Sequence, residues 1–133
     1  MIVMAIAIVA GVVVLFALFG LVNNSAPEIE KGPFREAWKK VVEKSSDVQT
    51  YEISIINADK LLDAALKKRR FRGETMGERL ISAKNSLSKR QAVWDAHKLR
   101  NRIVHEENVR LDKQKVHAAI KGFESALRDL GAL

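Results

Sequence analysis

The sequence contains no cysteine, and this absence excludes several kinds of protein. Without cysteine there can be no disulfide framework, no thiol nucleophile, no zinc–thiolate centre and no acylated cysteine of the lipoprotein type. Proline is scarce as well, since both prolines among the 133 residues lie in the segment 23–33. Residues 1–22 carry no charge at all, so the remaining 111 residues hold all 39 charged side chains. A segment of that length is typical of a single domain, which excludes a multidomain enzyme.

Residues 1–22 consist of 20 apolar residues and two glycines. As a helix, this segment would be about 33 Å long, which matches the roughly 30 Å hydrocarbon core of a bilayer. A cleaved signal peptide would have a basic stretch before a shorter apolar run, followed by a small-residue cleavage site. Here no basic residue precedes the run, and Asn24-Ser25-Ala26 is only a weak cleavage sequence. We therefore expect a retained, single-pass transmembrane helix.

Lysine and arginine lie on only one side of this apolar segment. None precedes it, whereas Lys31, Arg35, Lys39 and Lys40 follow it closely. Because loops rich in lysine and arginine are retained in the cytoplasm, we expect the C-terminal domain to be cytoplasmic. No second segment is long and apolar enough to span a membrane, which excludes a polytopic transporter.

The composition of residues 23–33, with both prolines and a glycine, predicts a linker before a domain over residues 34–133. In that domain apolar residues recur at helical spacing, and no strand-like alternation is present. Two of the predicted apolar helix faces are Met76, Leu80, Ala83 and Leu87, and Val116, Ala119, Ile120, Phe123, Leu127 and Leu130. Capping sequences divide the domain into helices; they are Ser45-Ser46-Asp47, Thr75-Met76-Gly77-Glu78, Asp112 and the terminating Gly131. The sequence therefore predicts an all-α protein with one N-terminal transmembrane helix and a bundle of four to five helices.

The net charge of +7 is concentrated in residues 67–102, which hold 12 basic and three acidic residues. Arginine can grip phosphate oxygens through two parallel hydrogen bonds, so this segment suits RNA, and an anionic membrane surface is an alternative partner. A third interpretation is a solvated helix end whose cations complement the helix dipole. The residues that we expect to bind RNA are Lys67, Lys68, Arg69, Arg70, Arg72 and Arg102.

The helix predicted from about Gln91 to Glu106 carries the densest group of chemically capable side chains. At about 100° per residue, Ala96, Leu99 and Ile103 form a core stripe, and a second arc of charged residues faces solvent. A third arc mixes apolar with polar side chains; its members are Val93, Trp94, His97, Arg100, Asn101, Val104 and His105. This mixture predicts a half-buried pocket wall or a protein interface.

Within this helix, Arg100-Asn101-Arg102-Ile103-Val104-His105 resembles the signature of the HEPN family. That signature is an arginine, a polar residue, three further residues and a histidine on a late helix of a small helical bundle. The resemblance covers roughly residues 34–130 in helix order, and its specific part is this hexapeptide with the preceding Trp-Asp-Ala-His-Lys-Leu. It implies a HEPN-like bundle whose two copies dimerise with their motifs facing each other in a cleft. The N-terminal membrane anchor departs from the family pattern.

Many members of this family are metal-independent endoribonucleases, so the resemblance implies catalytic roles for Arg100, Asn101 and His105. Histidine, with an unperturbed pKa of about 6.5, can take the proton of a ribose 2′-hydroxyl. Arginine can stabilise charge on the phosphate, and asparagine can position the imidazole or the phosphate. Because Arg100 and His105 lie about 140° apart on one helix, acting on one phosphate would require the motifs of two chains or a helix that loosens near His105. No metal or cofactor is expected, since neither an HExxH pattern nor a phosphate-binding glycine loop is present.

The alternative function is a non-catalytic RNA-binding or protein-interaction module tethered to the membrane. In that case His105 would simply favour the dipole at the end of its helix, and Arg100 would pair with a carboxylate on a neighbouring helix. The expected partners are RNA, the lipid bilayer through residues 1–22, a second copy of the chain, and an antitoxin or other protein that the sequence does not identify.

Overall fold

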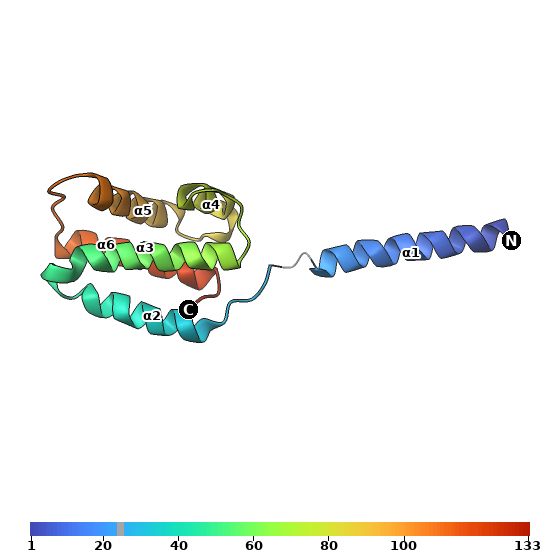
Figure 1. Cartoon of the computed structure of the whole chain (residues 1–133), viewed down its shortest axis with the longest axis horizontal. Helices are drawn as coiled ribbons and strands as arrows, with labels where there is room; N and C mark the ends of the chain where they lie inside the picture. Colours follow the sequence, from blue (N-terminus) through green and yellow to red (C-terminus); the bar gives the residue numbers. More distant parts are fainter. Residues whose placement is uncertain (24–25) are drawn as a thin grey trace.

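The computed structural model describes residues 1–23 and 26–133, so Asn24 and Ser25 of the predicted linker lie outside the described residues. The described ranges contain six α-helices and two 3-10 turns, and no β-strand. The helices are α1 Ile2–Asn23, α2 Lys31–Lys44, α3 Tyr51–Lys68, α4 Met76–Ser82, α5 Arg90–His105 and α6 Lys113–Asp129, and the 3-10 turns are Val48–Thr50 and Lys84–Ser86 (Figure 1). The prediction of an all-α protein with an N-terminal apolar helix and four to five further helices is confirmed.

The first helix, α1, is apolar on all sides. Its span Ile2–Val22 has a mean hydropathy of 3.1, and none of it is buried by the rest of the chain. At about 1.5 Å per residue this span is long enough to cross the hydrocarbon core of a bilayer. An exposed apolar surface of this size requires an apolar surrounding.

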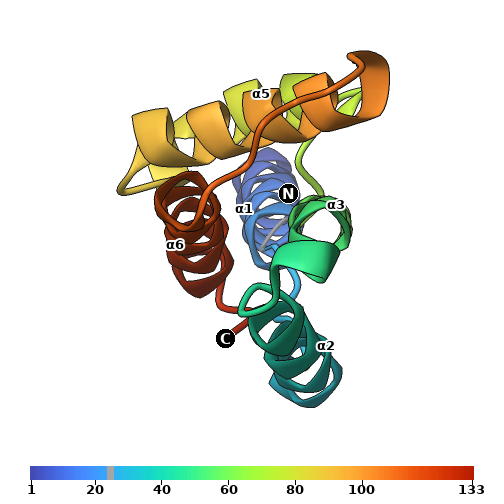
Figure 2. The same cartoon turned by 90° about the vertical axis from the view of Figure 1, so that its left-hand side faces the viewer.

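The core of the bundle forms around α3, which contacts α2, α4, α5 and α6. Figure 2 looks along α2, α3 and α6 and shows α5 crossing over α3 and α6. The side chains of Ile55, Leu62, Leu66 and Phe123 at the centre are completely buried. Burying one such side chain contributes about 1.5–3 kcal/mol, so these residues fix how the helices pack. All six apolar residues predicted for the face of the last helix are buried; they are Val116, Ala119, Ile120, Phe123, Leu127 and Leu130.

The predicted caps are present. Thr75 and Glu78 form a reciprocal capping box at the start of α4, and the Asp112 carboxylate accepts the Lys115 backbone N–H at the start of α6. Asp47 accepts the Gln49 backbone N–H, but it opens a 3-10 turn that leads into α3. The helix after the capping box is shorter than its apolar face suggests, because α4 ends at Ser82 and the buried Leu87 follows a 3-10 turn.

The folded domain extends further toward the N-terminus than the predicted boundary at residue 34. Helix α2 begins at Lys31, so Gly32 and Pro33 lie in its first turn. Proline is tolerated there because the first N–H groups of a helix have no intrahelical partner. The preceding Ile29 is buried and packs against the core. The last part of the predicted linker therefore belongs to the bundle.

The crossing of α5 over α6 depends on a close backbone contact at Gly122. A Cβ atom at this position would lie 2.7 Å from the carbonyl oxygen of Ala92. Glycine therefore lets α6 approach α5 closely, and this close contact helps to determine where α5 crosses the bundle.

Candidate functional site

A cleft of about 780 Å³ lies between α3, α5 and the start of α4. Its α5 wall consists of Trp94, His97, Lys98, Arg100 and Asn101; its α3 wall consists of Ile56, Asp59, Lys60 and Asp63; Thr75, Met76 and Gly77 complete the lining. Ligand sites in proteins range from about 300 to 1,000 Å³, so the cleft is large enough for a small molecule or for part of a polymer chain.

A buried carboxylate and a buried imidazole meet at the base of this cleft. The Asp59 Oδ1 and His97 Nδ1 atoms are 2.8 Å apart, and the two side chains are only 4% and 8% exposed. This distance is within hydrogen-bonding range, and a carboxylate can accept a hydrogen bond from an imidazole N–H. The other ring nitrogen, Nε2, lies 3.4 Å from the Asn101 side-chain nitrogen. Asp59 and Asn101 together fix the orientation of the His97 ring.

The arginine of the HEPN-like motif lies beside this pair. Arg100 Nη1 donates to Asn101 Oδ1 at 3.0 Å, and Arg100 Nε lies 3.4 Å from Asp59 Oδ2. The contact with Asp59 is an ion pair but not a hydrogen bond, because Nε has no hydrogen-bond partner among the described residues. The prediction that Arg100 could pair with a carboxylate on a neighbouring helix is confirmed by Asp59. One third of the side chain stays exposed, at 32%, so Arg100 can still meet a ligand in the cleft.

A second group of charged residues connects α3, at Asp63, with the loop that follows α3. The buried Arg79 donates to Asp63 through Nε at 2.7 Å and Nη2 at 3.2 Å, and through Nη1 to the Gly73 carbonyl oxygen at 2.6 Å. Lys67 Nζ lies 3.2 Å from the same carboxylate. Partial burial acts to raise the pKa of Asp63, but the hydrogen bonds and charges of Arg79 and Lys67 outweigh it and hold the pKa below its ordinary value. Two of the 12 basic residues in the positive segment therefore serve the fold.

His105 does not reach the cleft. It is the last residue of α5 and is exposed, as is its neighbour Val104. Arg102 is also exposed and pairs at 3.2 Å with Glu106, the residue that directly follows α5. The mixed arc of this helix therefore divides in two. Its first part forms a pocket wall, as predicted, with Val93 in the core, and its last part faces solvent.

The remaining residues predicted to bind RNA lie at the C-terminal end of α3. Lys68, Arg70 and Arg72 are exposed, and no hydrogen bond or ion pair of their side chains is found with any residue that the structure describes. Arg69 is half-buried and donates to the Pro27 carbonyl oxygen at 3.4 Å. The structure thus brings Arg100 and Asn101 together in the cleft, groups Lys68–Arg72 elsewhere, and brings His105 and Arg102 to neither place.

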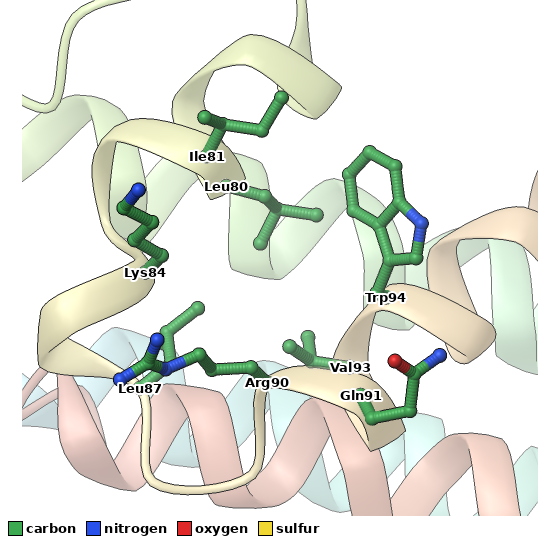
Figure 3. Close-up of a pocket in the computed structure, with 8 residues that line it drawn as sticks. All are labelled: Leu80, Ile81, Lys84, Leu87, Arg90, Gln91, Val93 and Trp94. Atoms are coloured by element: carbon green, nitrogen blue, oxygen red, sulfur yellow. The ribbon is translucent and has the colours of Figure 1, made fainter.

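A smaller pocket of about 190 Å³ lies between α4 and the start of α5 (Figure 3). It is lined by Leu80, Ile81, Lys84, Leu87, Arg90, Gln91, Val93 and Trp94. Trp94 lines this pocket and the larger cleft as well, and its ring centroid lies 5.9 Å from that of His97. The pocket is below the size of ordinary ligand sites, so we take Trp94 as the partition that shapes the larger cleft.

Three residues of the cleft region had no assigned role in the sequence interpretation: Asp59, Asp63 and Arg79. His97 was predicted on the pocket wall, but its carboxylate partner was not predicted. A signal for Asp59 is present, because it lies beside the apolar stripe of Ile55, Ala58 and Leu62 on the same helix, where a carboxylate needs a partner. Asp63 follows at a spacing of four, which places both carboxylates on one side of α3. Their partners on α4 and α5 depend on the tertiary fold. No group of three or more metal-ligating side chains occurs within the described ranges.

No protein-family model matches the chain, and no similar protein is found among curated proteins or solved structures. A family assignment for this chain therefore depends on the Arg100–His105 motif and on its place in the fold.

Proposed function

We propose that this protein is a membrane-anchored, HEPN-like helical domain that acts on RNA, with α1 as a single-pass anchor and the bundle in the cytoplasm. The observation that carries the proposal is the pairing of Arg100 and Asn101 on the wall of a cleft that also contains Lys60 and Lys98. A guanidinium and an amide side by side, with two ammonium groups near, suit the phosphate and base edges of a single-stranded nucleic acid. The lysines and arginines that follow α1 support the cytoplasmic orientation.

Cleavage of RNA would require a second copy of the chain, because His105 lies outside the cleft that contains Arg100. In a homodimer joined through α5, His105 of each copy would face the Arg100 and Asn101 of the other. The exposed apolar side chain of Val104, at 49%, offers contact area for such an interface. His105 would then take the 2′-hydroxyl proton while Arg100 stabilises the phosphate.

A specific observation also favours the second candidate function, a non-catalytic RNA-binding or protein-interaction module. Arg100 shares the Asp59 carboxylate with His97, so part of its charge is already neutralised within the chain. Such an arginine can orient a ligand, yet it stabilises a developing phosphate charge less than one without a carboxylate neighbour.

The two candidates differ in one experiment on the full chain in nanodiscs with end-labelled RNA in EDTA. The enzyme predicts cleavage that falls at least a hundredfold in His105→Ala, falls in Arg100→Ala, and persists in the control His117→Ala, which changes an exposed histidine on α6. The module predicts RNA binding that weakens in Arg100→Ala, with no cleavage by any variant. Equal cleavage by all variants contradicts the catalytic assignment, and an absence of both binding and cleavage contradicts action on RNA.

A further inference from the structure

The segment that follows α1 is partly folded onto the bundle. Ile29 is buried in the core cluster, and the Pro27 carbonyl oxygen accepts a hydrogen bond from Arg69 at the end of α3. The span of α1 ends at Val22, so five residue steps separate it from Pro27. An extended chain covers at most about 3.6 Å per residue, so Pro27 lies within about 18 Å of the end of the span. If α1 is in a membrane, the end of α3 must lie close to the surface of that membrane.

Several chain segments meet at this end of the bundle, where Figure 1 shows the start of α2 beside the end of α3. Lys31 at the start of α2 donates to the Leu133 carbonyl oxygen at 3.2 Å, so the C-terminus lies there too. Residues 67–72 carry five basic side chains and no acidic one. Exposed acidic residues also lie near, namely Glu28, Glu30 and Glu74. Lys67 and Arg69 have partners within the chain, so the exposed basic side chains without a partner among the described residues of this run are Lys68, Arg70 and Arg72.

The backbone conformation of Arg70 indicates that a positive charge at this position has a role outside the fold. Helices α3 and α6 end in the same motif, in which the third residue after the helix donates its backbone N–H to a carbonyl oxygen five residues earlier. In α6 the left-handed position is Gly131, with a φ of 77°, as is usual for this motif. In α3 it is Arg70, with a φ of 61°, and an arginine there is strained because of its Cβ atom. The fold would be more stable with glycine, so a cation here serves something other than the fold.

We infer that Lys68, Arg70 and Arg72 form a headgroup-binding surface that docks the bundle on an anionic bilayer beside its own anchor. The ligand is the phosphate of an anionic phospholipid headgroup, and the inference rests on the membrane anchoring proposed above but not on the action on RNA. The cytoplasmic leaflet carries the negative surface potential that attracts basic side chains next to a membrane anchor.

The arrangement favours lipid over RNA at this surface. The only aromatic residue in the basic run, Phe71, is partly buried against the core, which leaves less of its ring for stacking on a base. The short connection to α1 also keeps the end of α3 near the bilayer, where a polymer with the same charge as the lipid would be repelled. Docking would leave the cleft, which lies along α3 and α5, open to a separate ligand.

The test uses the full chain in nanodiscs of neutral phosphatidylcholine or of phosphatidylcholine with phosphatidylglycerol, and measures hydrogen–deuterium exchange of residues 68–74. We expect exchange to be at least tenfold slower in the anionic discs and to recover in about 0.5 M salt, where the Debye length is below about 5 Å. The variant Lys68→Gln/Arg70→Gly/Arg72→Gln should lose this protection, by about fivefold for each charge removed. Arg70→Gly relieves strain, so a loss of docking in this variant would not come from unfolding.

A matched control, Arg110→Gln/Lys113→Gln/Lys115→Gln, removes three exposed charges in the loop between α5 and α6 and in the first turn of α6, at the opposite end of the bundle (Figure 1). It should keep the protection of residues 68–74. Equal exchange in neutral and anionic discs overturns the inference while leaving the anchor intact. Protection by added RNA in neutral discs, without any effect of anionic lipid, overturns it in favour of RNA. A chain that does not stay with neutral discs overturns the anchoring proposal, and the inference with it.

Discussion

The domain has two charged regions that differ in how their charges are balanced. In the cleft, Asp59 lies within 3.4 Å of both His97 and Arg100, so these two side chains share a carboxylate partner in the same chain. At the end of α3, Arg70 and Arg72 are exposed and their side chains bind no other residue that the structure describes. Charges that are buried with partners are part of the fold, whereas charges without partners at a strained position are available to bind something outside the chain.

The largest expected effect comes from removing the shared carboxylate in the cleft. Asp59→Ala leaves the buried His97 and the part-buried Arg100 without their shared partner, so the free energy of unfolding should fall, by up to about 3–5 kcal/mol. Urea unfolding of the full chain in detergent, followed by the fluorescence of Trp38 and Trp94, measures this change. The control is Asp95→Ala, whose exposed pair with Lys98 should contribute at most about 1 kcal/mol. Similar losses in the two variants would remove the energetic distinction between the cleft and the surface.

Gly131 and Arg70 occupy the same left-handed position after α6 and α3, so each can be replaced by the residue found at the other. The destabilising replacement, Gly131→Arg, should have the second-largest effect. Gly131→Arg places a Cβ atom at a φ of 77°, where no neighbouring atom lies within 4 Å of it. The cost is therefore one of backbone conformation alone, and we expect a loss of about 1–2 kcal/mol in the same urea assay. Gly32→Arg serves as a control, since this glycine also has open space around it but is not at positive φ. If the two variants lose equal stability, the left-handed position is not what makes Gly131 favourable.

The opposite exchange, Arg70→Gly, should stabilise the bundle. It removes the strain at a φ of 61° but adds freedom to the unfolded chain, so we expect a net gain of about 0.5–1 kcal/mol. A higher urea midpoint with an unchanged slope would report this gain. A lower midpoint would mean that the Arg70 side chain supports the fold, and it would end the distinction between the two charged regions.

Much of the fold could be predicted because it depends on local chemistry. The capping box at Thr75, the cap at Asp112 and the terminator Gly131 each act within one turn of chain, and each is present as predicted. Apolar spacing alone also predicted the buried face of α6. The length of α4 was less accessible, because a 3-10 turn after Ser82 carries Leu87 into the core without continuing the helix.

The site was harder to predict because its partners come from different helices. Helical geometry places Arg100 and His105 on different sides of α5, and the structure agrees, with Arg100 in the cleft and His105 outside it. It could not show that Asp59 would lie under His97, because that depends on how α5 crosses the bundle at Gly122. The strain at Arg70 was equally inaccessible, since its φ follows from how the loop to α4 is held.

The smallest expected effect concerns Asp63, which lies between the two regions because it holds Arg79 in the fold and also binds Lys67 of the basic run. Its pKa is lowered in the folded state, with the effects of Arg79 and Lys67 exceeding that of partial burial. A group with a lowered folded pKa stabilises the protein above its unfolded pKa of about 4, and the stabilisation is lost as the pH falls through the folded value.

We therefore expect the melting temperature of Asp63→Asn to lie a few degrees below that of the unchanged chain at pH 5–7, and the gap to close below about pH 4. Glu124→Gln is a matched control, because the pKa of Glu124 is also lowered, by Lys121 and Arg128 against partial burial, in a pair on α6. Its gap should close over a similar range of pH. The gap for Arg70→Gly should not depend on pH there, since the described residues give Arg70 no titrating partner. If the gap for Asp63→Asn is also independent of pH, Asp63 holds neither Arg79 nor Lys67 as an ion pair, and the basic surface at the end of α3 extends to Lys67.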